Sequence, residues 1–450
     1  MNVRSAGVIN AGFKVLGAGL NFLLVPLYIG VYGLRVYGAL SLLLSLSQYM
    51  SFLDLGFSAA LVRESVRVRT VGDQRYFRLK RIAIGLLLGG GGAVTAIAAL
   101  TSARWGPAVH LDHVDQLWLG VASAGVITVL TLASSCLSSA FVATLRFGHL
   151  NAYNLLRNLV PQLACVAAYT KLRGLGPALA VGAMAQCGVV GLQALLLARE
   201  ERSLVRPALA SRAAPLAAFL KDSFGFSAQT LVSSLTMPLL QTVVGARFGS
   251  QANGIVDASR RVLFAARGVL EAVFVPVFAH TTRLVEAADR GGLRRLAARV
   301  TAASATGALV LYGVLAITLT PLLAAWVGTE TGARLEEVAG PLLVGVTFTC
   351  PHIGLYYVLA AMSAGRVVNI VAGLLSLLIL ALGFLPAFQS VRDVVLLYNA
   401  AMLAGAIVTL ALGFWCLVWL RPAPALSAGA GGADPIETPG VAASGSAGLQ

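Results

Sequence analysis

The stretch NAGFKVLGAGLNFLLVPLYIGVYGLRVYGALSLLLSLSQYMSFLDLGFSAALVRE occupies residues 10–64 and decides the fold class. Two long apolar runs dominate it, at 7–29 and 37–60. A helix needs about 20 apolar residues to cross the hydrocarbon core of a bilayer. Each run meets that length, so the stretch predicts two membrane-spanning helices near the N-terminus.

The rest of the chain repeats this pattern. Of its 450 residues, 58% are hydrophobic and 11% are charged, whereas a soluble domain carries roughly 25% charged residues. Strands of a membrane barrel would alternate in polarity, but these runs are continuously apolar, which favours helices. We therefore predict an all-α polytopic membrane protein of about twelve spans. The ten further runs are 82–103, 117–141, 152–170, 177–198, 223–246, 252–278, 301–323, 339–361, 367–388 and 395–420.

The basic charge has an uneven distribution that predicts topology. The net charge is +15, and most of the 33 Lys and Arg residues fall in one set of alternating loops and tails. Positive residues gather on the cytoplasmic side of membrane proteins, so we expect both termini to be cytoplasmic. The same residues can contact anionic lipid headgroups. This distribution explains the charge without nucleic acid, which we do not expect as a partner.

An internal repeat suggests two halves. Tyr32-Gly33 followed by Tyr37-Gly38 matches Phe248-Gly249 followed by Asn253-Gly254, 216 residues later. Six spans with their loops occupy about that length, and an even number makes the repeats parallel. We predict two pseudo-symmetric six-helix bundles with a substrate path between them. The predicted domains are a first bundle at 1–205, a cytoplasmic linker at 206–222, a second bundle at 223–420 and a disordered cytoplasmic tail at 421–450.

The predicted span at 252–278 carries the most charge. Its charged residues are Asp257, Arg260, Arg261, Arg267 and Glu271. All but Arg261 fall within about 80° of one another around a helix, and such a stripe cannot face lipid. The arginines are candidates for contact with substrate in a cavity, and the two carboxylates are candidates for ion coupling. The alternative is mutual neutralisation, in which Asp257 pairs with Arg260. Glu271 would then pair with Arg267.

Other spans carry isolated polar residues. Lys14 and Asn21 share one face of the first span, Gln48 belongs to a polar face of the second, and Arg157 lies in the fifth. These four are further cavity candidates, and Asp54 is a weaker candidate for ion coupling. The competing roles are snorkelling to the surface for Lys14 and anchoring or pairing at the membrane interface for Arg157 and Asp54. Helix packing explains small polar residues equally well.

Several other functions lack support in the sequence. The longest outer loop is expected near 324–338, which is too short for a catalytic domain, so an enzyme such as a polymerase or ligase is disfavoured. No phosphate-binding G-x-x-x-x-G-K-[ST] motif occurs. The five cysteines lie in apolar runs without C-x-x-C spacing. We therefore expect no cofactor, no resident metal and no catalytic residues.

The quoted stretch resembles the start of the Wzx-type polysaccharide flippases. These O-antigen and exopolysaccharide exporters belong to the multidrug/oligosaccharidyl-lipid/polysaccharide exporter (MOP) superfamily. Span number, termini and paired halves agree with that family over about residues 5–420. The residues that carry the resemblance are Pro26, Tyr32-Gly33, Tyr37-Gly38, Asp54-Leu55-Gly56 and Arg63.

The resemblance implies a substrate and a location. The substrate would be an oligosaccharide linked to undecaprenyl pyrophosphate, moved from the cytoplasmic to the periplasmic leaflet of the bacterial inner membrane. The drive would be a proton or Na⁺ gradient or the membrane potential. A polysaccharide polymerase and a chain-length regulator are candidate partners. The family lines its cavity with basic residues, and Lys14 and the arginines of the eighth span occupy comparable places here.

A rival interpretation is an ion-coupled exporter of drugs or other small molecules from the same superfamily. Such an exporter of cations would need a negatively charged cavity. The predicted spans carry five basic residues and three acidic ones. This excess favours an anionic substrate.

Overall fold

The computed structural model describes residues 3–54, 57–58, 61, 75–111, 114–143, 147–204, 216–287, 289–360 and 362–419, although some side chains within these ranges are not described. Every regular element in this part of the chain is a helix. They are α1 (Val3–Gln48), η1 (Tyr49–Asp54), α3 (Arg75–Leu100), α4 (Ser102–Trp105), η2 (Pro107–Val109), α5 (Leu117–Ala143), α6 (Phe147–Leu172), α7 (Leu175–Leu204), α8 (Leu216–Glu286), α9 (Arg290–Val327), α10 (Thr329–Thr349), α11 (His352–Ala360), α12 (Ser363–Ala381), η3 (Leu382–Phe384) and α13 (Val391–Trp419).

The two longest elements each contain two membrane passes joined at a glycine. Gly33 interrupts α1 with φ 72° and ψ 160°, and Gly249 interrupts α8 with φ 83° and ψ 176°. Only glycine adopts this region readily, because a Cβ would clash with the backbone. These are the paired glycines of the predicted repeat. Equivalent breaks thus occur 216 residues apart.

The described helices account for the predicted number of spans. Two passes each for α1 and α8, one for α10 with α11, and one each for α3, α5, α6, α7, α9, α12 and α13 give twelve. By length and apolarity alone, seven described helices qualify as spans, or eight if the bent α10–α11 pair is one span. Helix α6 fails that test, and it carries Arg157 and several amide side chains. The chain is therefore a multi-pass membrane protein.

Three boundaries differ from the sequence prediction. The expected outer loop at 324–338 is helical except at Gly328, which has φ 86°. The expected single span at 339–361 bends by 52° between α10 and α11, because Pro351 has no N–H to continue the first helix. Helix α8 begins at Leu216, inside the predicted linker. Residues 205–215 and the predicted tail lie outside the described residues.

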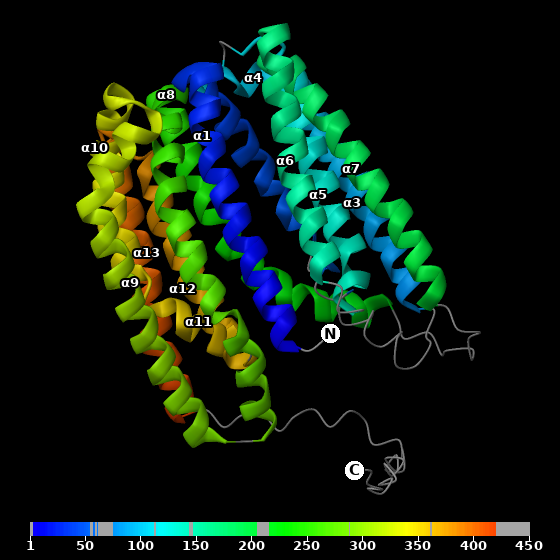
Figure 1. Cartoon of the computed structure of the whole chain (residues 1–450), viewed down its shortest axis with the longest axis vertical. Helices are drawn as coiled ribbons and strands as arrows, with labels where there is room; N and C mark the ends of the chain where they lie inside the picture. The colour runs from blue at the N-terminus through cyan, green and yellow to red at the C-terminus, as the bar shows by residue number, and fades with distance from the viewer. Residues whose placement is uncertain are drawn as a thin grey trace, which may run out of the picture.

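The helices form two groups with α1 and α8 between them (Figure 1). Helices α3, α5, α6 and α7 lie on one side, and α9 to α13 lie on the other. Helix α1 begins and α13 ends at the lower end of the view, so both ends of the described bundle face the same side. The arrangement agrees with the predicted pair of pseudo-symmetric bundles.

The buried apolar core forms several clusters. The first joins α1 to α5, α6 and α7 through residues such as Leu43 and Leu179, and it continues into the second half through Val262 of α8 and Leu323 of α9. Further clusters lie wholly in the second half, around Leu355 and Tyr398. The halves are therefore packed against each other through a shared apolar contact.

A glycine crossing joins the halves. A Cβ placed on Gly38 would lie 1.7 Å from the carbonyl oxygen of Ser250, and one placed on Gly254 would lie 2.7 Å from the carbonyl oxygen of Leu34. Residues 34 and 38 of α1 correspond to 250 and 254 of α8 under the 216-residue repeat. The contact is thus reciprocal, as expected around a two-fold axis. The side-chain amide of Asn253 also donates to the Gly38 carbonyl at 3.0 Å.

The crossing predicts a large effect of a single methyl group. In Gly38→Ala the new Cβ would overlap backbone that no rotamer change can move. Overpacking commonly costs about 1–3 kcal/mol, and we expect a value at the upper end or beyond, seen as a lower melting temperature in detergent. Gly30→Ala on the same helix is the control, because its Cβ would meet open space. Equal stability of both variants would show that the crossing can separate without loss.

Candidate functional site

Asp257 is the centre of a buried ionic network. Its carboxylate is 1% exposed and accepts from Arg260 Nη2 at Oδ1 and from Arg261 Nε at Oδ2, both at 2.8 Å. Gln241 Nε2 donates to Oδ1 at 2.8 Å, and the Tyr37 hydroxyl donates to Oδ2 at 2.5 Å. Four donors saturate the two oxygens. Two arginines share one carboxylate, so the group keeps a net positive charge.

The network connects the two halves. Tyr37 belongs to the second pass of α1, whereas Asp257 and Gln241 belong to the two passes of α8. Gln241 also donates to the Ser41 hydroxyl at 3.1 Å. Residue 41 is the repeat equivalent of residue 257, so the first half has a serine where the second has the charged hub. The symmetry of the fold is therefore broken where the charge lies.

The first cavity lies in the N-terminal half, against α8. Its volume is about 120 Å³ and its lining comes from α1, α5, α6, α7 and α8. Arg261 reaches it from α8, and Arg157 reaches it from α6. Tyr28 and Gln162, which share a hydrogen bond of 2.5 Å, also line it. We call it the N-half cavity. It brings together two predicted residues that are 104 positions apart in the sequence.

Arg157 has no ionic partner among the described residues. Its Nη1 is near the Ser134 hydroxyl at 3.2 Å and the Thr131 carbonyl at 3.4 Å. The Ser134 hydroxyl donates to Gln193 Oε1 at 2.5 Å, which holds that serine in place. The Nε of Arg157 is buried without a partner in this part of the chain. An unpaired cation at this depth is unfavourable unless a wet cavity or an anion compensates it.

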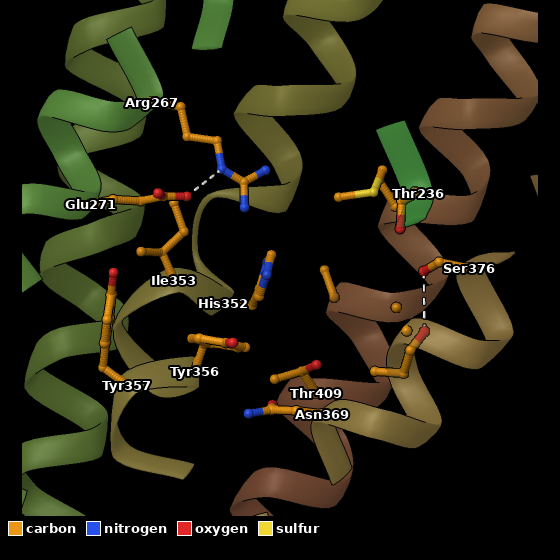
Figure 2. A pocket seen from close by; sticks show the side chains of 15 residues that line it. Thr236, Arg267, Glu271, His352, Ile353, Tyr356, Tyr357, Asn369, Ser376 and Thr409 are labelled. Atoms are coloured by element: carbon orange, nitrogen blue, oxygen red, sulfur yellow. Dashed lines mark hydrogen bonds and ion pairs between the residues drawn. The ribbon is translucent and has the colours of Figure 1, made fainter. Parts of the chain in front are cut away.

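The second cavity lies within the C-terminal half (Figure 2). Its volume is about 390 Å³, and both passes of α8 together with α11, α12 and α13 line it. Arg267 Nε donates to Glu271 Oε1 at 2.7 Å, with the arginine side chain 13% exposed and the carboxylate 38% exposed. We call it the C-half cavity. Its polar lining residues are Thr236, Arg267, Glu271, His352, Tyr356, Tyr357, Asn369, Ser376 and Thr409.

The charged stripe on α8 thus divides between two places. The sequence predicts that the arginines line one cavity, with mutual pairing as the alternative. The structure contains both predicted ion pairs, yet Arg261 and Arg267 each line a cavity. They are six residues apart, which is about 120° around a helix and about 9 Å along it. Arg260, also predicted to line the cavity, is in the lining of neither, and its guanidinium lies 5.8 Å from the centre of the Phe264 ring.

The remaining predicted residues are spread out. Lys14 lies in α1, but its side chain is outside the described part. Asn21 donates to the Gly17 carbonyl at 2.9 Å, and Gln48 is exposed and lines neither cavity. Asp54 in η1 accepts from the Ser58 hydroxyl at 3.0 Å. These contacts are local.

Some residues of the site have no distinctive signal in the sequence. Tyr37 stands out only as part of the repeat, and Gln241, His352 and Asn369 are single polar residues in or beside apolar runs. A search for every amide and imidazole within predicted spans would find the last three. Which cavity, if any, each of these residues lines can be learned only from the way the helices pack together.

Comparisons with known proteins identify the fold. No protein-family profile and no curated protein matches the sequence. Among solved structures, an outward-facing multidrug resistance MATE family transporter of the MOP superfamily superposes with a TM-score of 0.63 and 13% identity, over 93% of this chain and 96% of that one. The lipid II flippase MurJ in an inward closed conformation gives 0.62 and 11%, over 91% and 89%. The Vibrio cholerae MATE transporter VcmN in its bent form gives 0.61 and 13%, over 92% and 96%. The chain therefore has the fold of the MOP-superfamily transporters.

Proposed function

We propose that this protein is a secondary transporter that flips a lipid-linked oligosaccharide with an anionic pyrophosphate, from the cytoplasmic to the periplasmic leaflet of a bacterial inner membrane. The lipid would be undecaprenyl pyrophosphate. The two halves would rock about their crossing and expose the internal cavities alternately to each side. The lipid tail would stay in the bilayer.

One observation carries the proposal. Arg157 and Arg261 line the same cavity, and Arg157 has no carboxylate within ion-pairing distance among the described residues. A guanidinium offers paired N–H donors that match phosphate oxygens. A pyrophosphate cannot cross hydrocarbon without such replacement of its water, since a charge at the bilayer centre is costly. The N-half cavity therefore has the chemistry for the phosphates of the headgroup.

The charge balance disfavours a cation exporter as the alternative. Asp257 contacts two arginines, and Glu271 is already paired with Arg267. Among the described residues, no unpaired carboxylate lines either cavity. A cationic drug would meet net positive charge in the N-half cavity, so it would be repelled.

Glu271 is the better candidate for coupling to a proton or Na⁺. Its carboxylate is 38% exposed in the C-half cavity and has one ion pair, whereas Asp257 is saturated by four donors. A coupling carboxylate must exchange its ion during the cycle. Release of Asp257 would first require four hydrogen bonds to break.

Transport in vesicles tests the proposal. The purified chain in proteoliposomes should translocate a fluorescent oligosaccharide on undecaprenyl pyrophosphate, measured by its loss of accessibility to a membrane-impermeant quencher. A cationic dye such as ethidium is the matched probe for the alternative, a cation exporter. Transport of the dye with no movement of the lipid-linked sugar would contradict the proposal. In a second measurement, an outward proton or Na⁺ gradient should change the rate at which the lipid-linked sugar is transported, but not the rate for the dye.

A further inference from the structure

We propose that the C-half cavity is a separate binding site for a neutral sugar unit. Its use during transport rests on the proposed function, where it would hold part of the oligosaccharide. Binding of the sugar does not rest on the proposed function, because it depends only on the residues that line this cavity. At about 390 Å³ the cavity falls within the size range of small-molecule pockets, about 300–1,000 Å³.

The strongest sign of a ligand is Asn369. Its side chain is 8% exposed, lines the cavity, and has neither its Nδ2 nor its Oδ1 hydrogen-bonded among the described residues. A buried amide without partners costs free energy unless a ligand or water satisfies it. Figure 2 shows Asn369 beside Thr409, below Tyr356 and His352. One amide offers a donor and an acceptor together, which is what adjacent sugar hydroxyls require.

His352 adds an acceptor to the cavity. Its Nδ1 contacts the Thr349 carbonyl oxygen, and because a carbonyl only accepts, Nδ1 carries the proton of the neutral ring. The Nε2 is then the acceptor. Arg267 uses its Nε for Glu271, and Figure 2 shows its two other nitrogens turned toward the cavity. The lining therefore offers both donors and acceptors.

Two aromatic residues supply an apolar surface. Tyr356 and Tyr357 line the cavity from α11, with ring centres 5.7 Å apart and planes 88° apart. The C–H face of a pyranose ring is apolar and packs on such rings, while its hydroxyls point outward to polar groups. The combination is typical of a site for a polyhydroxy compound.

The charge of the cavity favours a neutral ligand. Glu271 and Arg267 neutralise each other at 2.7 Å, so a phosphate would meet the carboxylate, and a cation could bind at Glu271 only after this pair opens. The N-half cavity, in contrast, keeps positive charge. Phosphate chemistry and sugar chemistry thus belong to different cavities on two sides of α8.

The test uses uncharged sugars without lipid or phosphate. The full chain in nanodiscs would be titrated with glucose, galactose, N-acetylglucosamine and their disaccharides, and binding followed by saturation-transfer NMR. We expect at least one to bind saturably, and Asn369→Leu and Thr409→Val each to weaken it roughly tenfold, as for one lost hydrogen bond. Thr318→Val is the control, since its hydroxyl donates to the Val314 carbonyl on the exposed face of α9.

The outcomes separate this proposal from the proposed function. Arg157→Gln should leave sugar binding unchanged while it impairs transport. If no sugar in the panel binds, or if Asn369→Leu and Thr409→Val both bind like the parent protein, the sugar site is disproved. Saturable Na⁺ binding at the same residues without any sugar binding would replace it by a cation site. Sugar binding without transport of the lipid-linked sugar would leave the site intact and overturn the flippase.

Discussion

Arg157→Gln should reduce transport of the lipid-linked oligosaccharide about 10- to 150-fold without lowering stability. The fold-change corresponds to the loss of charged hydrogen bonds to phosphate, worth about 1.5–3 kcal/mol. Stability should hold or rise, because the wild-type side chain is a cation with a buried, unpartnered Nε and no carboxylate partner among the described residues. Initial rates in proteoliposomes and the melting temperature in detergent measure the two effects.

A matched variant isolates the cavity from general loss of charge. Arg334→Gln removes an arginine that is 50% exposed and paired with Glu330 at 2.8 Å, away from both cavities. It should transport normally. Arg157→Lys should keep part of the activity, since Lys retains the charge but not the fork of donors. Full transport by Arg157→Gln would remove the main support for an anionic substrate.

Asp257→Asn should destabilise the protein more than neutralisation of Arg157 or Glu271. The change leaves Arg260 and Arg261 without a counter-charge. The amide nitrogen of the asparagine would also replace one of the two carboxylate oxygens and face the donors that now bind it. Breaking a buried ion pair from one side costs about 3–5 kcal/mol. The expected readout is a strongly lowered melting temperature and a loss of monodisperse protein in detergent.

Two further variants make the result specific. Glu271→Gln leaves a single arginine, 13% exposed, without its partner, and the carboxylate it replaces is 38% exposed, so it should cost about 1.5–3 kcal/mol, less than Asp257→Asn. Adding Arg260→Gln to Asp257→Asn removes one of the two stranded charges and should recover part of the stability. If Asp257→Asn melts like Glu271→Gln, the hub does not hold the halves together.

The fold could be predicted well because it depends on local signals. Continuous apolar runs give the spans, and the glycines at 33 and 249 follow from a repeat that is visible in the sequence. The bend at Pro351 was not predicted, although proline was the available signal. The helical course of 324–338 was not predicted either, because charged residues in a short turn resemble a loop.

The site could be predicted only in part. The i,i+3 and i,i+4 spacings on α8 named the ion pairs correctly. That Arg261 shares Asp257 and meets Arg157 could not be inferred from the sequence, because α6 and α8 approach each other only in the folded bundle. Helical periodicity gives the face of a residue, but not which neighbour covers that face. For this reason one expected cavity became two.

The glycine crossing also restricts how the gene can change. Gly38 packs against Ser250, and Gly254 packs against Leu34. An insertion or deletion between residues 34 and 38, or between 250 and 254, would therefore break both contacts at once. The two repeats must therefore keep the same four-residue spacing at the crossing, whereas their side chains at other equivalent positions can differ. The equivalent positions 41 and 257 show that freedom, since one carries a serine and the other the aspartate of the ionic network.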